Sequence, residues 1–142
     1  MSDKYFVDTN ILIYTVDLSA GIKCARAQTL VRGLWETRKG VISTQVLQEL
    51  YAALRRKLKA PMSPSEAEEV LLSYFAWEVV INNRASIVRA IEFEQRYRIS
   101  FWGALMLQAA EKAGARTVYS EDLTDGGSYE GIVVVNPFHT QG

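Results

Sequence analysis

Short apolar runs alternate with longer segments of helical periodicity along the whole chain, and this alternation limits the folds available to it. The runs predicted to be buried strands are 5–7, 41–43, 77–81, 117–119 and 132–135. The predicted helices are a short one near 11–14 and longer ones at 22–38, 45–57, 64–75, 84–97 and 101–113, where apolar residues recur every three or four positions. Such alternation is typical of a parallel sheet with helices on its faces. We therefore expect an α/β fold, a three-layer α/β/α sandwich with a mainly parallel central sheet.

Length and composition limit the class of protein further. A chain of 142 residues suits one domain spanning 1–142, and 49% hydrophobic with 23% charged residues is ordinary for a globular chain. The single cysteine, Cys24, cannot form an internal disulfide, and no basic segment followed by a long apolar one opens the chain. These features favour a cytoplasmic protein without a membrane span, in which Cys24 contributes helix packing.

The charge balance excludes binding of nucleic acid through a strong overall positive field. Sixteen Lys and Arg residues equal sixteen Asp and Glu residues, so any phosphate-binding surface must be local. One candidate is the basic run 55–57 with Lys59. Such a run is also common at a solvated helix end, where it is favoured by the helix dipole, and both interpretations remain open.

The polar triplet Asp8-Thr9-Asn10 separates the first predicted strand from the first short helix. In an open parallel sheet, ligands bind in the crevice at the carboxyl ends of the strands. Asp8 is therefore the first candidate site residue. The alternative is that Asp8 or Asn10 only caps the helix that begins near Ile11, since both residue types are good caps.

Two further regions can bring acids to the same edge. The strand 117–119 runs into Ser120-Glu121-Asp122, so Asp122 is the second strong candidate, with Glu121 and Asp125 as weaker ones. Glu49 lies at the border of the apolar face of the helix 45–57, in a register that allows it to point toward the crevice. The alternative for Glu49 is an ordinary solvated glutamate on a helix flank.

Clustered carboxylates predict one kind of chemistry. The sequence has no glycine-rich phosphate loop, no Ser/His/Asp set and no Cys/His metal spacing. Facing carboxylates repel one another, and their pKa values rise unless a cation neutralises them. Oxygen ligands suit Mg²⁺ or Mn²⁺, which activate water and stabilise charge on phosphoryl oxygens. The pattern predicts metal-dependent hydrolysis of a phosphodiester.

Gly103 is locally out of place. Ser100 is well positioned to cap the helix that follows, and a capping box requires an acid or amide three residues later. Glycine stands there instead, and glycine within a helix costs up to about 1 kcal/mol relative to alanine. A broken local rule without a visible compensation calls for an explanation.

The motifs FVDTNILIY, STQVLQELY, SFWGALMLQAAE, YSEDL and VVNPF together resemble the PIN-domain ribonucleases, in particular the VapC-like toxins of bacterial type II toxin–antitoxin pairs. The resemblance covers essentially the whole chain, in the family's order. It implies that Asp8, Glu49 and Asp122 are the catalytic and metal-binding acids. It also implies an RNA substrate, Mg²⁺ or Mn²⁺ as cofactor, a homodimer, and an antitoxin whose tail covers the active site. Asn10 would support the site by hydrogen bonding, with Thr9, Ser120, Glu121 and Asp125 as further supporting residues.

Similar family members carry an aspartate at the position of Gly103. The resemblance therefore implies that this chain lacks one metal ligand, and that its ribonuclease activity is impaired. The alternative is a catalytically inactive PIN fold that binds RNA or an antitoxin. A third hypothesis is a small-molecule phosphohydrolase that uses the same acids.

Overall fold

Six strands form one sheet in the computed structural model, which describes residues 3–139. They are β1 (Tyr5–Val7), β2 (Gly40–Ser43), β3 (Glu78–Val80), β4 (Thr117–Tyr119), β5 (Ser128–Tyr129) and β6 (Ile132–Val135). The strand order is β3-β2-β1-β4-β6-β5, and every neighbouring pair is parallel except β5 with β6. The mainly parallel sheet is confirmed. The short strand β5 was not anticipated, and the termini of the predicted domain, 1–2 and 140–142, lie outside the described residues.

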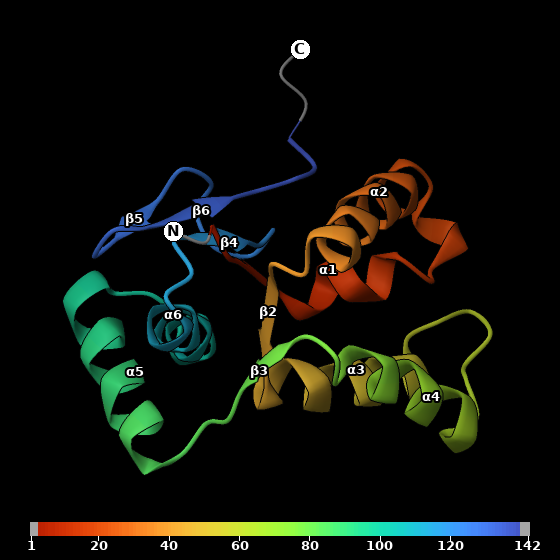
Figure 1. Cartoon of the computed structure of the whole chain (residues 1–142), viewed down its shortest axis with the longest axis horizontal. Coiled ribbons are helices and arrows are strands. Elements are labelled where there is room, and N and C mark those ends of the chain that lie inside the picture. The colour runs from red at the N-terminus through yellow and green to blue at the C-terminus, as the bar shows by residue number, and fades with distance from the viewer. Residues whose placement is uncertain (1–2, 140–142) are drawn as a thin grey trace.

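The helices lie on both sides of this sheet (Figure 1). They are α1 (Thr9–Tyr14), α2 (Ile22–Thr37), α3 (Thr44–Arg56), α4 (Pro64–Tyr74), α5 (Arg84–Tyr97) and α6 (Phe101–Ala113), with one 3₁₀ turn, η1 (Leu18–Ala20). In Figure 1, α5 and α6 lie on one side of the sheet and α1 and α2 on the other, as expected for the α/β/α fold class. None of the helices within residues 3–139 combines the length and apolar character needed to cross a lipid bilayer.

The helix starts follow local capping chemistry. At α4, Ser63 Oγ accepts a hydrogen bond from the Glu66 amide at 3.2 Å, and the Glu66 carboxylate accepts one from the Ser63 amide at 2.9 Å. These two bonds complete a capping box. At α6, Ser100 Oγ accepts from the Gly103 amide at 3.0 Å, but glycine has no side chain to return the bond. The predicted cap at Ser100 is confirmed, and so is the missing half of its capping box.

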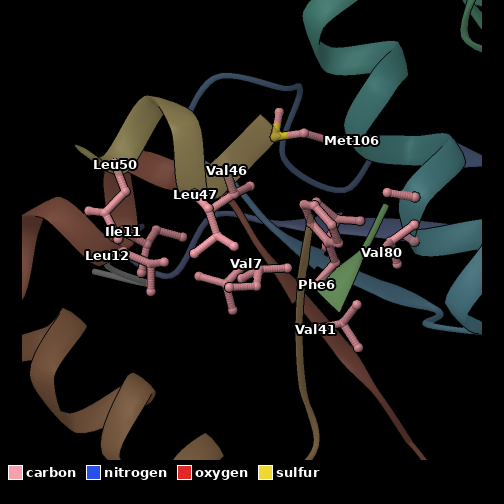
Figure 2. Close-up of a cluster of buried hydrophobic side chains, with 14 of the residues drawn as sticks. Phe6, Val7, Ile11, Leu12, Val41, Val46, Leu47, Leu50, Val80 and Met106 are labelled. Atoms are coloured by element: carbon pink, nitrogen blue, oxygen red, sulfur yellow. The ribbon is translucent and has the colours of Figure 1, made fainter. Parts of the chain in front are cut away.

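The hydrophobic core packs around the first strand (Figure 2). Phe6 and Val7 of β1 are fully buried. In Figure 2 they lie among apolar side chains from β2, β3, α1, α3 and α6, namely Val41, Val80, Ile11, Leu12, Val46, Leu47, Leu50 and Met106. Burying each such side chain contributes about 1.5–3 kcal/mol. The polar triplet that follows Val7 therefore begins from a well-fixed backbone.

The strand order reverses between β1 and β4. The chain leaves β1 and returns as β2 on one side, whereas β4 pairs with β1 on the other side. Val7 and Tyr119 are register partners, so the residues after them, Asp8 and Ser120, leave the sheet side by side. Ligand crevices in parallel α/β sheets form at such a reversal.

Candidate active site

A cleft of about 470 Å³ lies at the carboxyl ends of β1 and β4. The predicted acids Asp8, Glu49 and Asp122 all line it. Its other lining residues include Thr9, Asn10, Gln45, Arg56, Lys57, Ser100, Trp102 and Gly103. Residues from four separate parts of the sequence therefore meet in this one hollow.

Asp8 is both a helix cap and a residue of the cleft. Its amide donates to the Tyr119 carbonyl at 2.9 Å, which joins it to the end of β4. Its Oδ1 accepts from the Thr9 amide at 2.6 Å, and Oδ2 accepts from Ser120 Oγ at 2.9 Å. The helix α1 consequently starts at Thr9, two residues earlier than expected. The structure confirms that Asp8 caps α1 and places it in the lining of the cleft, while its catalytic role stays a prediction.

The electrostatic environment disfavours the charged form of Asp8. Only 3% of the residue is exposed, and this burial, together with the nearby charges of Asp122 and Glu49, raises the pKa of Asp8 to about 6. The hydrogen bonds from Ser120 and Thr9 offset part of this increase. Within residues 3–139, no lysine or arginine forms an ion pair with any of the three acids. Their combined negative charge is left without a paired cation from the described residues.

The first two residues of α1 orient the other two acids. Thr9 Oγ1 donates to Glu49 Oε1 at 2.7 Å, and Asn10 Nδ2 lies 3.2 Å from Asp122 Oδ2. Both distances are suitable for hydrogen bonds that hold a carboxylate in one direction. Thr9 and Asn10, which were predicted as supporting residues, thus contact Glu49 and Asp122.

Ser120 connects Asp8 to the loop that carries Asp122. It is fully buried, and its Oγ accepts from the amides of Asp122 at 3.1 Å and Leu123 at 3.3 Å while donating to Asp8. One hydroxyl therefore fixes the spacing between the ends of β1 and β4.

Glu121 and Asp125 lie outside the lining of the cleft. The Glu121 carboxylate accepts from the Tyr14 hydroxyl at 2.5 Å and forms an ion pair with Lys23. Although burial acts in the opposite direction, the bonds from Lys23 and Tyr14 lower the pKa of Glu121.

Asp125 makes contacts farther along the same loop. It accepts from the Asn136 amide at 2.9 Å and lies 2.5 Å from His139 Nδ1. The contacts of Glu121 and Asp125 brace the loop that follows β4.

Gly103 lies in the cleft wall, close to the loop after β4. A Cβ atom at this position would lie 2.8 Å from Leu123 Cδ2 and 3.1 Å from Ser100 Oγ. Any side chain at position 103 therefore requires Leu123 to move. That movement is small, because Cδ2 is the end of a flexible side chain.

The three acids do not by themselves form a complete metal cage. The described part of the chain contains no group of three or more His, Cys, Asp or Glu side chains placed to hold one metal ion. Mg²⁺, however, is usually bound through one or two carboxylates, with waters and substrate phosphates completing its shell. Asp8 and Asp122, which have no basic partner in the part of the chain that the structure describes, fit that smaller donor set. The metal site remains a prediction.

Sequence patterns did not single out every residue of the cleft. Gln45 and Trp102 line it although no motif marked either as functional. Of the basic run, Arg56 and Lys57 line the cleft, whereas Arg55 donates to the Met62 carbonyl at 2.9 Å. The position of Gln45, one turn before Glu49 on the same helix, was the signal that could have found it.

Comparisons with solved structures agree with this fold. A toxin–antitoxin complex from Klebsiella pneumoniae has a TM-score of 0.71 at 18% identity, over 96% of this chain and 100% of that chain. Mycobacterium tuberculosis VapC20, described as a sarcin–ricin-loop-cleaving toxin, has a TM-score of 0.66 at 20% identity, over 84% and 90%. DNA-bound VapBC from Salmonella typhimurium has a TM-score of 0.65 at 19% identity, over 94% and 97%.

Sequence comparison assigns the family. No curated protein sequence gives a significant match to the chain. The sequence model of the PIN domain matches residues 5–124, a span that runs from the start of β1 past Asp122 and so contains all three acids and Gly103. The chain therefore belongs to the PIN domain family.

Proposed function

We propose that the protein is a metal-dependent endoribonuclease toxin of a toxin–antitoxin pair, and that Gly103 reduces its activity. One observation carries the proposal. Asp8 is buried at the reversal of strand order beside Asp122, with a raised pKa and no basic partner among the described residues. Titratable groups perturbed in this way and placed in a cleft are typical of functional sites.

Asp8 and Asp122 are the residues that would hold Mg²⁺ or Mn²⁺. Such an ion, when bound, lowers the pKa of a water and stabilises charge on the phosphoryl oxygens. Asn10 keeps Asp122 oriented. The Thr9 hydroxyl donates a hydrogen bond to Glu49 Oε1. The other oxygen, Oε2, would then be available to accept a proton from the attacking water. Catalysis in this scheme depends on Asp8, Asp122 and Glu49 acting together.

The substrate and partner are proposed from the family and from the solved structures with the same fold. One of these is described as a toxin that cleaves the sarcin–ricin loop, and two others as a toxin–antitoxin complex and a DNA-bound VapBC. We accordingly propose RNA as the substrate, an antitoxin as the partner, a homodimer as the assembly and the cytoplasm as the location.

Gly103 explains the proposed loss of activity. It lines the cleft with Asp8 and Asp122, at the position where a carboxylate would add negative charge for a cation. Without that charge, cation affinity and positioning both decrease. The remaining acids Asp8, Glu49 and Asp122 still line the cleft.

The direct test compares this chain with Gly103→Asp on a labelled structured RNA, with Mn²⁺ or with EDTA. We expect Gly103→Asp to cleave at least tenfold faster than the unchanged chain, and only with metal. Gly103→Asn is the matched control, since it has the same size and no charge. Adding Asp8→Asn to Gly103→Asp should abolish cleavage. If neither chain cleaves and Asp8→Asn changes nothing, the nuclease proposal is wrong.

The second candidate is a catalytically inactive PIN fold that binds RNA or an antitoxin. The missing side chain at Gly103 is the observation that favours it. RNA or antitoxin affinity that responds neither to metal nor to Asp8→Asn, with no cleavage by Gly103→Asp, would support this function. Turnover of nucleotides without cleavage of RNA would instead identify a small-molecule phosphohydrolase.

A further inference from the structure

Trp102 is unusually exposed for its size and position. It is the second residue of α6, lines the cleft beside Gly103, and leaves 62% of its surface accessible. An edge-to-face contact with Phe101, with ring centroids 5.4 Å apart and planes at 75°, restricts the orientation of the indole. Large aromatic side chains contribute most to stability when buried. An oriented, exposed indole at the cleft is therefore available to a ligand.

Gln45 provides an independent sign of a ligand in the same part of the cleft. Only 6% of the residue is exposed, yet its Oε1 has no hydrogen-bond partner in the described part of the chain. Its Nε2 makes one long bond of 3.4 Å, to the Trp102 carbonyl. Buried polar atoms are nearly always paired, so an orphaned acceptor in a cleft calls for a partner. The weak bond on the other end of the amide allows the group to turn toward one.

The opposite end of the cleft carries positive charge. Arg56 and Lys57 are exposed at the end of α3, line the cleft, and make no ion pair within residues 3–139. Two free cations, an exposed aromatic ring and an unpaired amide acceptor are together the groups that bind a single-stranded nucleotide. In an RNA duplex, stacked neighbours cover both faces of each base, and the paired base of the other strand occupies its pairing edge. Only an unpaired base therefore has these groups available.

We propose that these residues form a subsite for one unpaired RNA base next to the acidic centre. The base stacks on the Trp102 indole, the Gln45 amide turns so that Oε1 accepts an N–H of the pairing edge, and a phosphate farther along the strand contacts Arg56 and Lys57. RNA as the ligand rests on the proposed function. The preference for an unpaired base rests on the indole and the amide alone.

The test measures RNA binding in EDTA, where metal-dependent cleavage cannot occur. Fluorescence anisotropy would compare a labelled RNA hairpin with an unpaired loop and a blunt RNA duplex of the same stem sequence. Stacking of one base predicts that Trp102→Ala weakens hairpin binding by roughly tenfold or more and leaves duplex binding nearly unchanged. Trp102→Phe should retain most of the affinity. Trp35→Phe, on α2 and outside the cleft lining, is the control and should have no effect.

A second variant separates recognition from folding. Gln45→Met keeps the length of the side chain and removes the acceptor, so thermal stability should not decrease, whereas hairpin affinity should fall several-fold. Arg56→Ala and Lys57→Ala should each weaken binding of both the hairpin and the duplex. Each should also lower the slope of log affinity against log salt concentration by about one. Reduced stability with unchanged hairpin affinity in Gln45→Met would assign Gln45 a purely structural role.

Several outcomes would overturn the subsite. These are wild-type hairpin affinity in Trp102→Ala, an equal loss for hairpin and duplex, no RNA binding by the unchanged chain, or an altered oligomeric state of Trp102→Ala without a change in RNA affinity. Failure of the proposed function looks different. If Gly103→Asp never cleaves RNA but hairpin binding still depends on Trp102, the subsite stands and the nuclease proposal fails. If Gly103→Asp cleaves RNA and Trp102→Ala leaves both RNA affinity and kcat/KM unchanged, the nuclease proposal stands and the subsite fails.

Discussion

The molecule contains two groups of acids that are treated in opposite ways. On the side of α5 and α6, Arg89 binds Glu111 through two bonds of 2.9 and 2.8 Å and Glu130 through one of 2.9 Å. These contacts lower the pKa of Glu130. In the cleft, Asp8 and Asp122 have no such partner among residues 3–139, and the pKa of Asp8 is raised. We name the first group the Arg89 cluster and the second, with Glu49, the cleft acids.

The difference shows that the acids of the Arg89 cluster are paired with a cation, whereas the cleft acids have no such pair within residues 3–139. An unneutralised buried carboxylate lowers the free energy of unfolding, because the native state must keep a charge away from water. Functional sites commonly carry such a penalty. The comparison therefore predicts that charge changes in the two groups have opposite effects on stability.

The largest effect is expected for Asp8→Asn. The rise of the Asp8 pKa from 3.8 to about 6 corresponds to a penalty of about 3 kcal/mol at neutral pH. Asparagine retains the cap of α1 without the charge. Urea unfolding in EDTA at pH 7.5 should show a free energy of unfolding up to about 3 kcal/mol higher for the variant. A lower free energy of unfolding for the variant would contradict the prediction that the charge of Asp8 destabilises the native state.

The pH dependence of the same pair of proteins supplies the control. Between pH 3.8 and about 6, the unfolded chain has lost the Asp8 proton while the native chain retains it. Because the native state then binds more protons, the contribution of Asp8 to stability falls as pH rises through this window and is constant above it. The difference between wild type and Asp8→Asn should accordingly be small near pH 3.5 and reach its full value above pH 6.

Addition of metal should reduce the destabilising effect of the charge on the cleft acids, and with it their difference from the Arg89 cluster. At a Mg²⁺ concentration ten times the dissociation constant, binding to the native state alone adds about 1.4 kcal/mol to the free energy of unfolding. We expect this gain in the unchanged chain and its loss in Asp8→Asn, measured by thermal unfolding with and without EDTA. An equal gain in both proteins would place the cation elsewhere.

Position 103 gives a finer test of charge in the cleft. Gly103→Asp and Gly103→Asn both require Leu123 Cδ2 to move, since a Cβ would lie 2.8 Å from it. Their difference in stability therefore isolates the added charge. On changing from EDTA to saturating Mg²⁺, that difference should shift in favour of Asp by roughly 1 kcal/mol, the size of a solvent-screened charge interaction. No shift would mean that position 103 does not sense the cation.

The smallest effect is expected in the Arg89 cluster. Glu111→Gln removes the negative charge of one partner of Arg89. The Glu111 side chain is partly exposed, with 38% of its surface accessible. Exposed ion pairs contribute little, so stability should fall by roughly 0.5 kcal/mol at low salt and by less at high salt. Chemical unfolding at two salt concentrations checks this. A gain in stability, as predicted for Asp8→Asn, would remove the contrast between the two groups.

The sequence predicted most of the fold because the signals were strong and local. Apolar runs such as 117–119 and the capping box at Ser63 need only neighbouring residues to be recognised. The strand Ser128–Tyr129 was missed because two residues carry no periodic pattern and depend on antiparallel pairing with β6. The start of α1 was misplaced because Asp8 serves as its cap, an assignment that local sequence left open.

The candidate site was predictable only in part. Asp8 and Asp122 follow strands, so topology alone places them at one edge. Gln45 could have been inferred from its position one helical turn before Glu49, whereas the place of Trp102 in the cleft depends on how α3 and α6 approach each other, which no local pattern encodes. The environments of Glu121 and Asp125 were equally hidden, since Tyr14 and Asn136 reach them from distant positions in the chain.

The pairing of Val7 with Tyr119 makes chain length, more than residue identity, the tightest constraint on this region. Insertion or deletion of one residue in β4 would exchange its inward and outward faces and carry Ser120 away from Asp8. Among diverging homologues, length changes should therefore accumulate in surface connections such as 57–63 while β1 and β4 keep their lengths. The distance between Asp8 and Ser120 is therefore set by the lengths and register of β1 and β4.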